Sequence, residues 1–105
     1  MSDMMVSGVI NSDGSKVSGH GFSVTSQGSG EYIISFSPPF SEVPAIVGSQ
    51  VNFGSTGQDP RDGVVFPFVN AGAATVITGD SAGGHSSRTF AFIARGNGPG
   101  AAAKA

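Results

Sequence analysis

Two polar loops contain the side chains of this chain that are best suited to contact a ligand. The segment Gln58-Asp59-Pro60-Arg61-Asp62-Gly63 brings together two carboxylates and a guanidinium, which form fixed hydrogen bonds with sugar hydroxyls or with a carboxylate. The segment from Asp80 to Arg88 adds His85, set between pairs of glycines and serines. The ligand-binding residues predicted on this basis are Asp59, Arg61, Asp62, Asp80, His85 and Arg88. Such residues also build solvated turns, and that alternative stays open.

Catalytic and metal-dependent chemistry is not favoured by the motifs of the chain. His20 lies between two glycines, as a surface residue of a turn would. With two histidines and no cysteine, a metal site would need carboxylates from several loops or from other copies, so no metal and no cofactor is predicted. The chain lacks a Gly-x-Ser-x-Gly elbow, and no Lys-Ser/Thr follows Gly83 as in a phosphate-binding loop. No acid–base set can be named, so we expect a protein that is not an enzyme.

Composition limits the classes of partner. Only 11% of the 105 residues are charged, five basic against seven acidic, which argues against nucleic acid as a partner. No apolar run approaches the roughly 20 residues of a membrane span. Without cysteines, a domain of this size gains stability from well-matched sheets or from association between copies, so a homo-oligomer is expected. The absence of cysteine fits any redox compartment, so localisation stays open, a secreted or particle-associated setting included.

Apolar residues recur at every second position in several short runs, which is the period of a β-strand. Segments rich in Gly, Asn and Asp separate the runs and suit tight turns. We therefore predict an all-β, antiparallel, jelly-roll-like β-sandwich of six to eight strands over residues 1–95, followed by a flexible Gly/Ala-rich tail over residues 96–105. The runs are Phe22 to Val24, Tyr32-Ile34-Phe36, Ala45-Val47-Val51-Phe53, Val64-Phe66-Phe68, Ala74-Val76 and Phe90-Phe92-Ala94.

The late runs carry two further expectations. Pro67 cannot donate a hydrogen bond to a neighbouring strand, so its strand is predicted to lie at a sheet edge or to contain a bulge. Val65 and Val69 lie opposite Phe66 and Phe68 in parity, and Ile93 lies opposite Phe92. Strands that are apolar on both sides are typical of a sheet at a subunit interface. The phenylalanines predicted to lie mostly in the core are Phe22, Phe36, Phe66, Phe68, Phe90 and Phe92.

The run from Gly30 to Pro44, with the pattern G-x-Y-x-I-x-F-x-x-P-F-x-x-x-P, resembles small trimeric β-sandwich modules. These are the complement- and tumour-necrosis-factor-like jelly rolls with their bacterial and phage-borne counterparts, and the H-type lectins, to whose final strand the run from Thr89 to Gly96 is similar. The resemblance covers roughly residues 19–96 and implies a three-fold assembly with a ligand or partner site at loops or between subunits.

The resulting expectation is a non-catalytic, oligomeric binding module that recognises a glycan or a protein surface. The alternative is a purely structural assembly unit of a particle or tail-like complex. The chain has no tryptophan and one tyrosine, so a phenylalanine would have to supply the aromatic platform on which many lectins stack a sugar.

Overall fold

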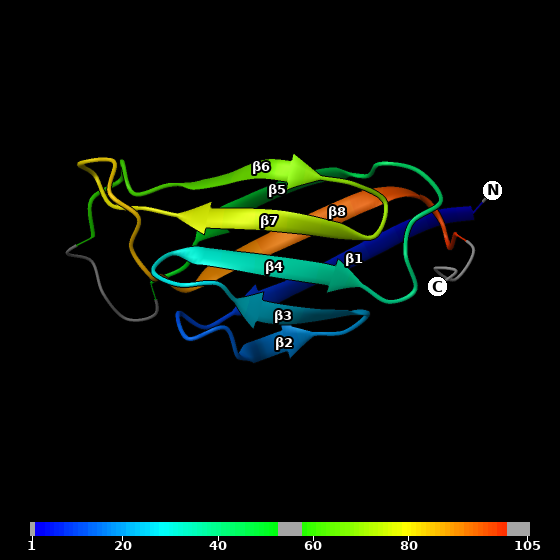
Figure 1. Cartoon of the computed structure of the whole chain (residues 1–105), viewed down its shortest axis with the longest axis horizontal. Helices are drawn as coiled ribbons and strands as arrows, with labels where there is room; N and C mark the ends of the chain where they lie inside the picture. Colours follow the sequence, from blue (N-terminus) through cyan, green and yellow to red (C-terminus); the bar gives the residue numbers. More distant parts are fainter. Residues whose placement is uncertain (1, 53–57, 101–105) are drawn as a thin grey trace.

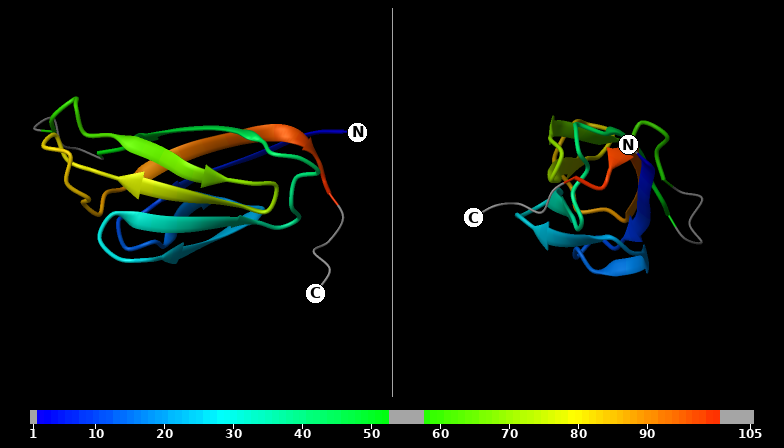
Figure 2. Two further views of the ribbon diagram at one scale, coloured as in Figure 1. Left: turned by 45° about the horizontal axis from the view of Figure 1, so that its top comes forward. Right: turned by 90° about the vertical axis from the view of Figure 1, so that its right-hand side faces the viewer.

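The computed structural model describes residues 2–52 and 58–100, and within these ranges it contains eight β-strands and no helix. The strands form two four-stranded antiparallel sheets that pack against each other (Figures 1 and 2). Sheet A has the order β2-β1-β8-β5 and sheet B the order β3-β4-β7-β6, which confirms the predicted β-sandwich. The strands are β1 (Ser2–Ile10), β2 (Lys16–Gly19), β3 (Phe22–Ser26), β4 (Glu31–Phe36), β5 (Ala45–Gln50), β6 (Val64–Val69), β7 (Ala73–Thr78) and β8 (Phe90–Gly98).

Strands from distant parts of the sequence are neighbours in both sheets. In sheet A, β8 lies between β1 and β5, and in sheet B β4 pairs with β7. The β1–β8 pairing runs from Ser2 opposite Gly98 to Ile10 opposite Phe90. No helix of the described ranges is long and apolar enough to cross a membrane.

The pairing of β1 with β8 corrects the predicted tail. Residues 96–98 belong to β8, because they continue its ladder with β1, so the prediction of a flexible segment is wrong for them. The backbone N–H of Gly100 then donates a hydrogen bond to the carbonyl oxygen of Pro39, at 2.8 Å. The remainder of the predicted tail, residues 101–105, lies outside the described residues.

The core lies between the sheets and is built by residues of alternating burial. In β4, Tyr32, Ile34 and Phe36 are buried, while the residues between them are half-buried. Aromatic rings meet across the two sheets: Phe22 packs edge-to-face on Phe92 with ring centroids 5.0 Å apart, and Tyr32 packs on Phe90 at 5.1 Å. The buried apolar residues are Val6, Ile10, Phe22, Tyr32, Ile34, Phe36, Phe40, Ala74, Val76, Phe90, Phe92 and Ala94.

Pro67 lies on an edge strand, and the register of β6 with β7 is irregular between Val65 and Phe68, so both expectations for this proline are confirmed. The irregularity also reverses the parity of the following residues. Phe68 is 71% exposed, whereas Val69 packs against the core. The predicted core position of Phe68 and the predicted opposite face of Val69 are therefore wrong.

Two other strand predictions need correction. In β5 the core contact is made by Ile46, so the shared parity of Ala45 and Val47 marks the outer face, and Phe53 lies outside the described residues. The alternation identified no strand before Phe22, although β1 and β2 lie there. In β1 the outward-facing Met5 is apolar like the inward-facing Val6 and Ile10, which hides the period of two.

The outward-facing apolar residues of β6 and β8 do not lie on the same surface of the sandwich. Val65 lies on β6 of sheet B and Ile93 on β8 of sheet A, and both are exposed, at 57% and 49%. Since the inner faces of both sheets pack together, the side chains of Val65 and Ile93 project from opposite outer faces of the sandwich. The apolar outer surface thus consists of two separate areas, one on each sheet.

Candidate functional site

Two loops lie side by side at one end of the sandwich, on the left in Figure 1. Residues 58–63 lead into β6, and residues 79–89 connect β7 to β8. The backbone N–H of Gly79 donates to the carbonyl oxygen of Gly63, at 3.1 Å, and joins the two loops where they leave the sheet. The fold therefore brings together the two segments that were singled out from the sequence.

The first loop is held in shape by Asp59. Its Oδ1 accepts hydrogen bonds from the backbone N–H of Arg61 at 2.9 Å and from Nε of Arg61 at 3.1 Å, while Oδ2 accepts from Nη2 at 2.8 Å. The bonds from the Arg61 side chain, supported by those from its backbone N–H and from Ser81, lower the pKa of Asp59 to about 2. The ion pair in turn raises the pKa of Arg61. Both groups are therefore charged at neutral pH.

The second loop turns around Asp80. Its Oδ1 accepts hydrogen bonds from the backbone N–H groups of Ala82 at 3.0 Å and Gly84 at 2.9 Å. These bonds, the one from Gly84 first, lower the pKa of Asp80. Gly83 has a φ of 87°, a left-handed conformation that favours glycine and lets the chain reverse here. His85 follows with an exposed side chain.

A shallow hollow of about 270 Å³ lies between the two loops and the outer face of sheet B. Val65 of β6 and Ile77 of β7, directly opposite each other in the ladder, supply its apolar part. Three of the six predicted ligand-binding residues, Arg61, Asp80 and His85, also line it. The full lining is Arg61, Gly63, Val65, Ile77, Gly79, Asp80, Gly83 and His85, which we call the loop hollow.

The other three predicted residues are not part of the lining. Asp59 holds Arg61, as described above. Asp62 and Arg88 form an ion pair with Nη1 of Arg88 2.7 Å from Oδ2 of Asp62, and their side chains are 6% and 24% exposed. The same nitrogen lies 3.1 Å from Oε1 of Gln58. These residues connect the two loops to each other.

Gln50, which the sequence did not single out, fastens this network to sheet A. Its Nε2 donates to the carbonyl oxygens of Gly63 at 3.0 Å and Gly79 at 2.7 Å. No local pattern distinguishes Gln50 from other polar residues at a strand end. Val65 and Ile77 could have been identified from the sequence, because each is an apolar residue at an outward strand position close to a polar loop.

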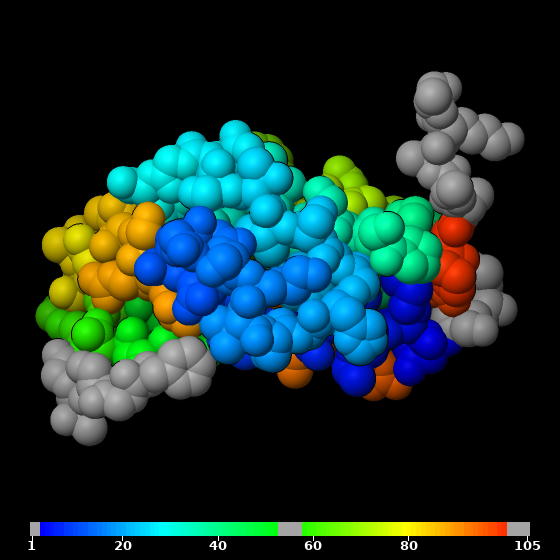
Figure 3. Space-filling view, turned by 90° about the horizontal axis from the view of Figure 1, so that it is seen from below, coloured from blue at the N-terminus to red at the C-terminus, as the bar shows by residue number. Residues whose placement is uncertain are grey.

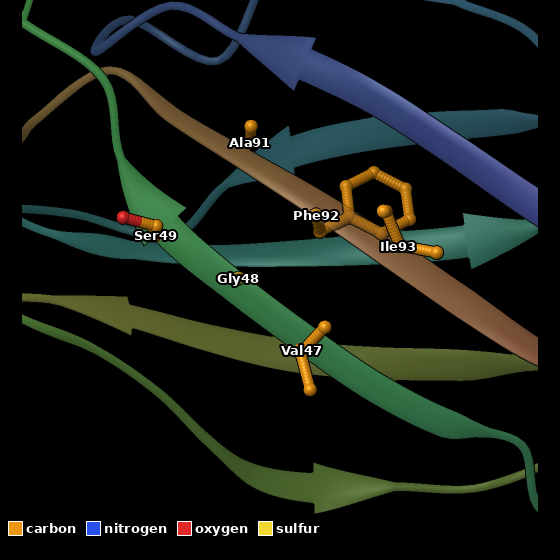
Figure 4. Close-up of a pocket in the computed structure, with 6 residues that line it drawn as sticks. All are labelled: Val47, Gly48, Ser49, Ala91, Phe92 and Ile93. Carbon is orange, nitrogen blue, oxygen red and sulfur yellow. The ribbon is translucent and has the colours of Figure 1, made fainter.

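A second hollow lies on the outer face of sheet A, between β5 and β8. It measures about 250 Å³ and is lined by Val47, Gly48, Ser49, Ala91, Phe92 and Ile93 (Figure 4). Val47 and Ile93 are directly opposite in the ladder, and their side chains are 66% and 49% exposed. The lining is apolar apart from Ser49, so this hollow suits a protein surface better than a polar ligand.

His20 is exposed and lies in the turn between β2 and β3. In Figure 1 this turn lies away from the two loops at the left end of the sandwich. Within residues 2–52 and 58–100, no three His, Cys, Asp or Glu residues are placed so that they could hold a metal ion. Comparison of the chain with protein-family models, with curated proteins and with solved structures finds no match.

Proposed function

We propose that this chain is a non-catalytic, homo-oligomeric binding module whose loop hollow takes a neutral, hydroxyl-rich ligand such as a glycan or the polar groups of a protein surface. The observation that carries the proposal is that apolar and polar side chains line the same hollow. Val65 and Ile77 of sheet B line the same hollow as Arg61, Asp80 and His85, which come from two different loops.

This combination matches the chemistry of a sugar ring. A sugar presents C–H groups on its faces and hydroxyls around its rim, and binding sites pair apolar contacts with a few fixed hydrogen-bonding groups. The Asp80 carboxylate accepts hydrogen bonds and the Arg61 guanidinium donates them, while an imidazole such as that of His85 can do either. Because Asp59 already neutralises Arg61, the loop hollow has no surplus positive charge that would attract an anionic ligand.

The electrostatics of the loops support binding over catalysis. Hydrogen bonds from Arg61 lower the pKa of Asp59 to about 2, and those from Gly84 and Ala82 lower the pKa of Asp80. A general acid or base works best with a pKa near the working pH. Both carboxylates have pKa values displaced away from that range.

The proposal is tested by an array of neutral and anionic glycans, followed by NMR titration of the best candidate. We expect shifts of the Arg61, Gly79 and His85 resonances and a loss of binding of at least about tenfold in His85→Ala or Arg61→Gln. His20→Ala is the matched control, since His20 is exposed in a different turn. Equal weakening by His20→Ala would refute the ligand site, and no binding of any neutral glycan at millimolar concentration would refute a glycan as its ligand.

The structural assembly unit is the second candidate, and exposed apolar side chains on both outer faces favour it. Met5, Val47 and Ile93 are exposed on sheet A, and Val65 and Phe68 on sheet B. A module of this kind would associate in light-scattering measurements while binding no glycan. The resemblance to trimeric modules leads us to expect the mass of three chains or a multiple of it.

A further inference from the structure

We propose that the free edge of β5 is a homotypic docking site, at which β5 of a second copy pairs antiparallel and joins two copies of sheet A into one eight-stranded sheet. The inference rests on the proposed self-association and names one of its contact surfaces; since this contact is two-fold, its combination with a three-fold assembly gives six chains. The sandwich has four edge strands, which are β2 and β5 in sheet A and β3 and β6 in sheet B. An edge strand presents unpaired backbone N–H and C=O groups, which can pair with another strand.

Two of the four edges are protected by their own sequence and geometry. In β6, Pro67 lacks an N–H group and the register is irregular between Val65 and Phe68. In β2, the strand is only four residues long, it carries Lys16, and its register with β1 shifts between Val9 and Ile10. Proline, lysine, irregular pairing and short length all hinder the addition of a further strand.

The edge of β3 is covered by the segment that precedes it. Nζ of Lys16 donates a hydrogen bond to the carbonyl oxygen of Phe22 at 2.8 Å and lies 4.7 Å from the centroid of the Phe22 ring. At the other end of the strand, the turn between β1 and β2 is close enough that a Cβ on Gly14 would lie 3.4 Å from Cβ of Ser26. Figure 3 looks onto this side of the molecule and shows the β1–β2 turn and β2 lying against β3.

Within the described residues, β5 has neither the proline nor the charge nor the irregular register that protects β6 and β2, while β6 of the other sheet lies next to it. The six residues of β5, Ala45–Gln50, include no charge and no proline. Its ladder with β8 is regular throughout, from Ala45 opposite Arg95 to Gln50 opposite Phe90. In the parts of the chain that the structure describes, no strand pairs with the side of β5 that faces away from β8.

Because β5 is uncharged and has a free edge, the strand that fits this edge is β5 of a second copy. Strand addition needs an open edge on both partners, and among the described strands β5 is the one that offers it. Self-pairing brings no like charges together, because the strand is uncharged. Antiparallel pairing centred on Val47 sets this residue opposite Val47 of the second copy. The cross-strand row Ser7, Ile93 and Val47 then continues into the neighbouring sheet.

The expected contact is modest in size. Two strands of six residues bury less surface than the roughly 1,200 Å² of a standard stable interface, so we expect a dissociation constant of about 10 µM or weaker. The contact has two-fold symmetry, because the same strand is used by both copies. Copies joined in this way form pairs, whatever further contacts assemble the pairs.

The test uses the full chain and opposite charges at one position. Val47→Lys and Val47→Glu each place like charges opposite each other and should be monomeric at concentrations where the wild type associates. An equimolar mixture of the two variants should recover association, since a lysine then faces a glutamate. Ile93→Lys is the matched control, because Ile93 lies beside Val47 on the same outer face but on an interior strand. Sedimentation velocity gives the masses, and circular dichroism checks that each variant folds.

The outcomes separate edge pairing from other modes and from the proposed function. Retained association in Ile93→Lys together with recovery in the mixture supports the inference. If Ile93→Lys dissociates the protein as fully as Val47→Lys, or the mixture stays monomeric, the contact is not an edge pairing and the inference fails. A wild type with a mass of three chains overturns it, because pairs require an even number of copies, while homo-oligomerisation stands. A wild type that is monomeric at all concentrations overturns both, whereas glycan binding by Val47→Lys tests the loop hollow separately.

Discussion

Nη1 of Arg88 lies 2.7 Å from Oδ2 of Asp62, and this ion pair joins the loop before β6 to the loop before β8. The Asp62 side chain is only 6% exposed, so water contributes little to stabilising its charge. Removing one partner of such a pair leaves a buried charge without compensation, which costs more than the pair itself contributes.

Arg88→Met is therefore expected to lower the free energy of unfolding by about 2 to 4 kcal/mol, measured by urea denaturation. The double variant Asp62→Leu/Arg88→Met should recover part of this loss, because neither charge is then left alone. Arg95→Met serves as the control, since its pair with Asp3 is exposed and its loss should leave the Tm unchanged. Equal effects of both arginine variants would contradict the structural role given to the buried pair.

The reversed parity of β6 predicts unequal effects of two phenylalanine substitutions. Phe90 is fully buried, so Phe90→Ala should cost about 3 to 5 kcal/mol of stability through lost contacts and a cavity. Phe68 is 71% exposed, and Phe68→Ala should change stability by less than about 1 kcal/mol. Thermal unfolding of both variants checks the prediction, and a large loss in Phe68→Ala would place its ring in the core after all.

Substitution of Gly8 is predicted to destabilise the protein, because atoms of Phe22 and Ser18 occupy the space that a side chain would need. A Cβ at this position would lie 2.7 Å from Cε1 of Phe22 and 2.8 Å from the carbonyl oxygen of Ser18. Gly8→Ala should therefore destabilise the protein by about 1 to 3 kcal/mol, since the Phe22 ring must move within a packed core. Gly72→Ala is the control, because its Cβ would meet nothing closer than 3.7 Å and should be nearly neutral in the same denaturation experiment.

The Asp59–Arg61 pair predicts a specific pH dependence. The pKa of Asp59 falls to about 2 from its ordinary value of 3.8, so the ionised carboxylate stabilises the folded loop. This contribution is fully present above pH 3.8 and is lost as the pH falls through about 2. Arg61→Gln should move the pKa of Asp59 upward, towards 3.8, in a carbon-13 NMR titration. A midpoint unchanged by Arg61→Gln would show that the hydrogen bonds from the backbone N–H of residue 61 and from Ser81 determine this pKa without the guanidinium.

The sequence by itself determined the strand period and the positions of most turns. In Tyr32, Ile34 and Phe36, alternation predicts the buried residues, because a strand directs successive side chains to opposite faces whatever its neighbours are. Pro67, which lacks a donor, likewise predicts that its strand lies at a sheet edge or contains a bulge, and β6 shows both an edge position and an irregular register. The two loops that line the loop hollow were also recognisable from their residue types. These are local properties of the chain.

Only the tertiary structure decided which residues meet. Phe22 contacts Phe92 across the two sheets, a contact between residues 22 and 92 that no local period contains. The same long-range pairing brought Val65 and Ile77 to one hollow with residues of the two loops, and it made Asp62 a buried partner of Arg88 instead of a residue of the hollow. Alternation with a period of two does not show which face of a strand is buried, because that depends on strands from distant parts of the chain that pack against it.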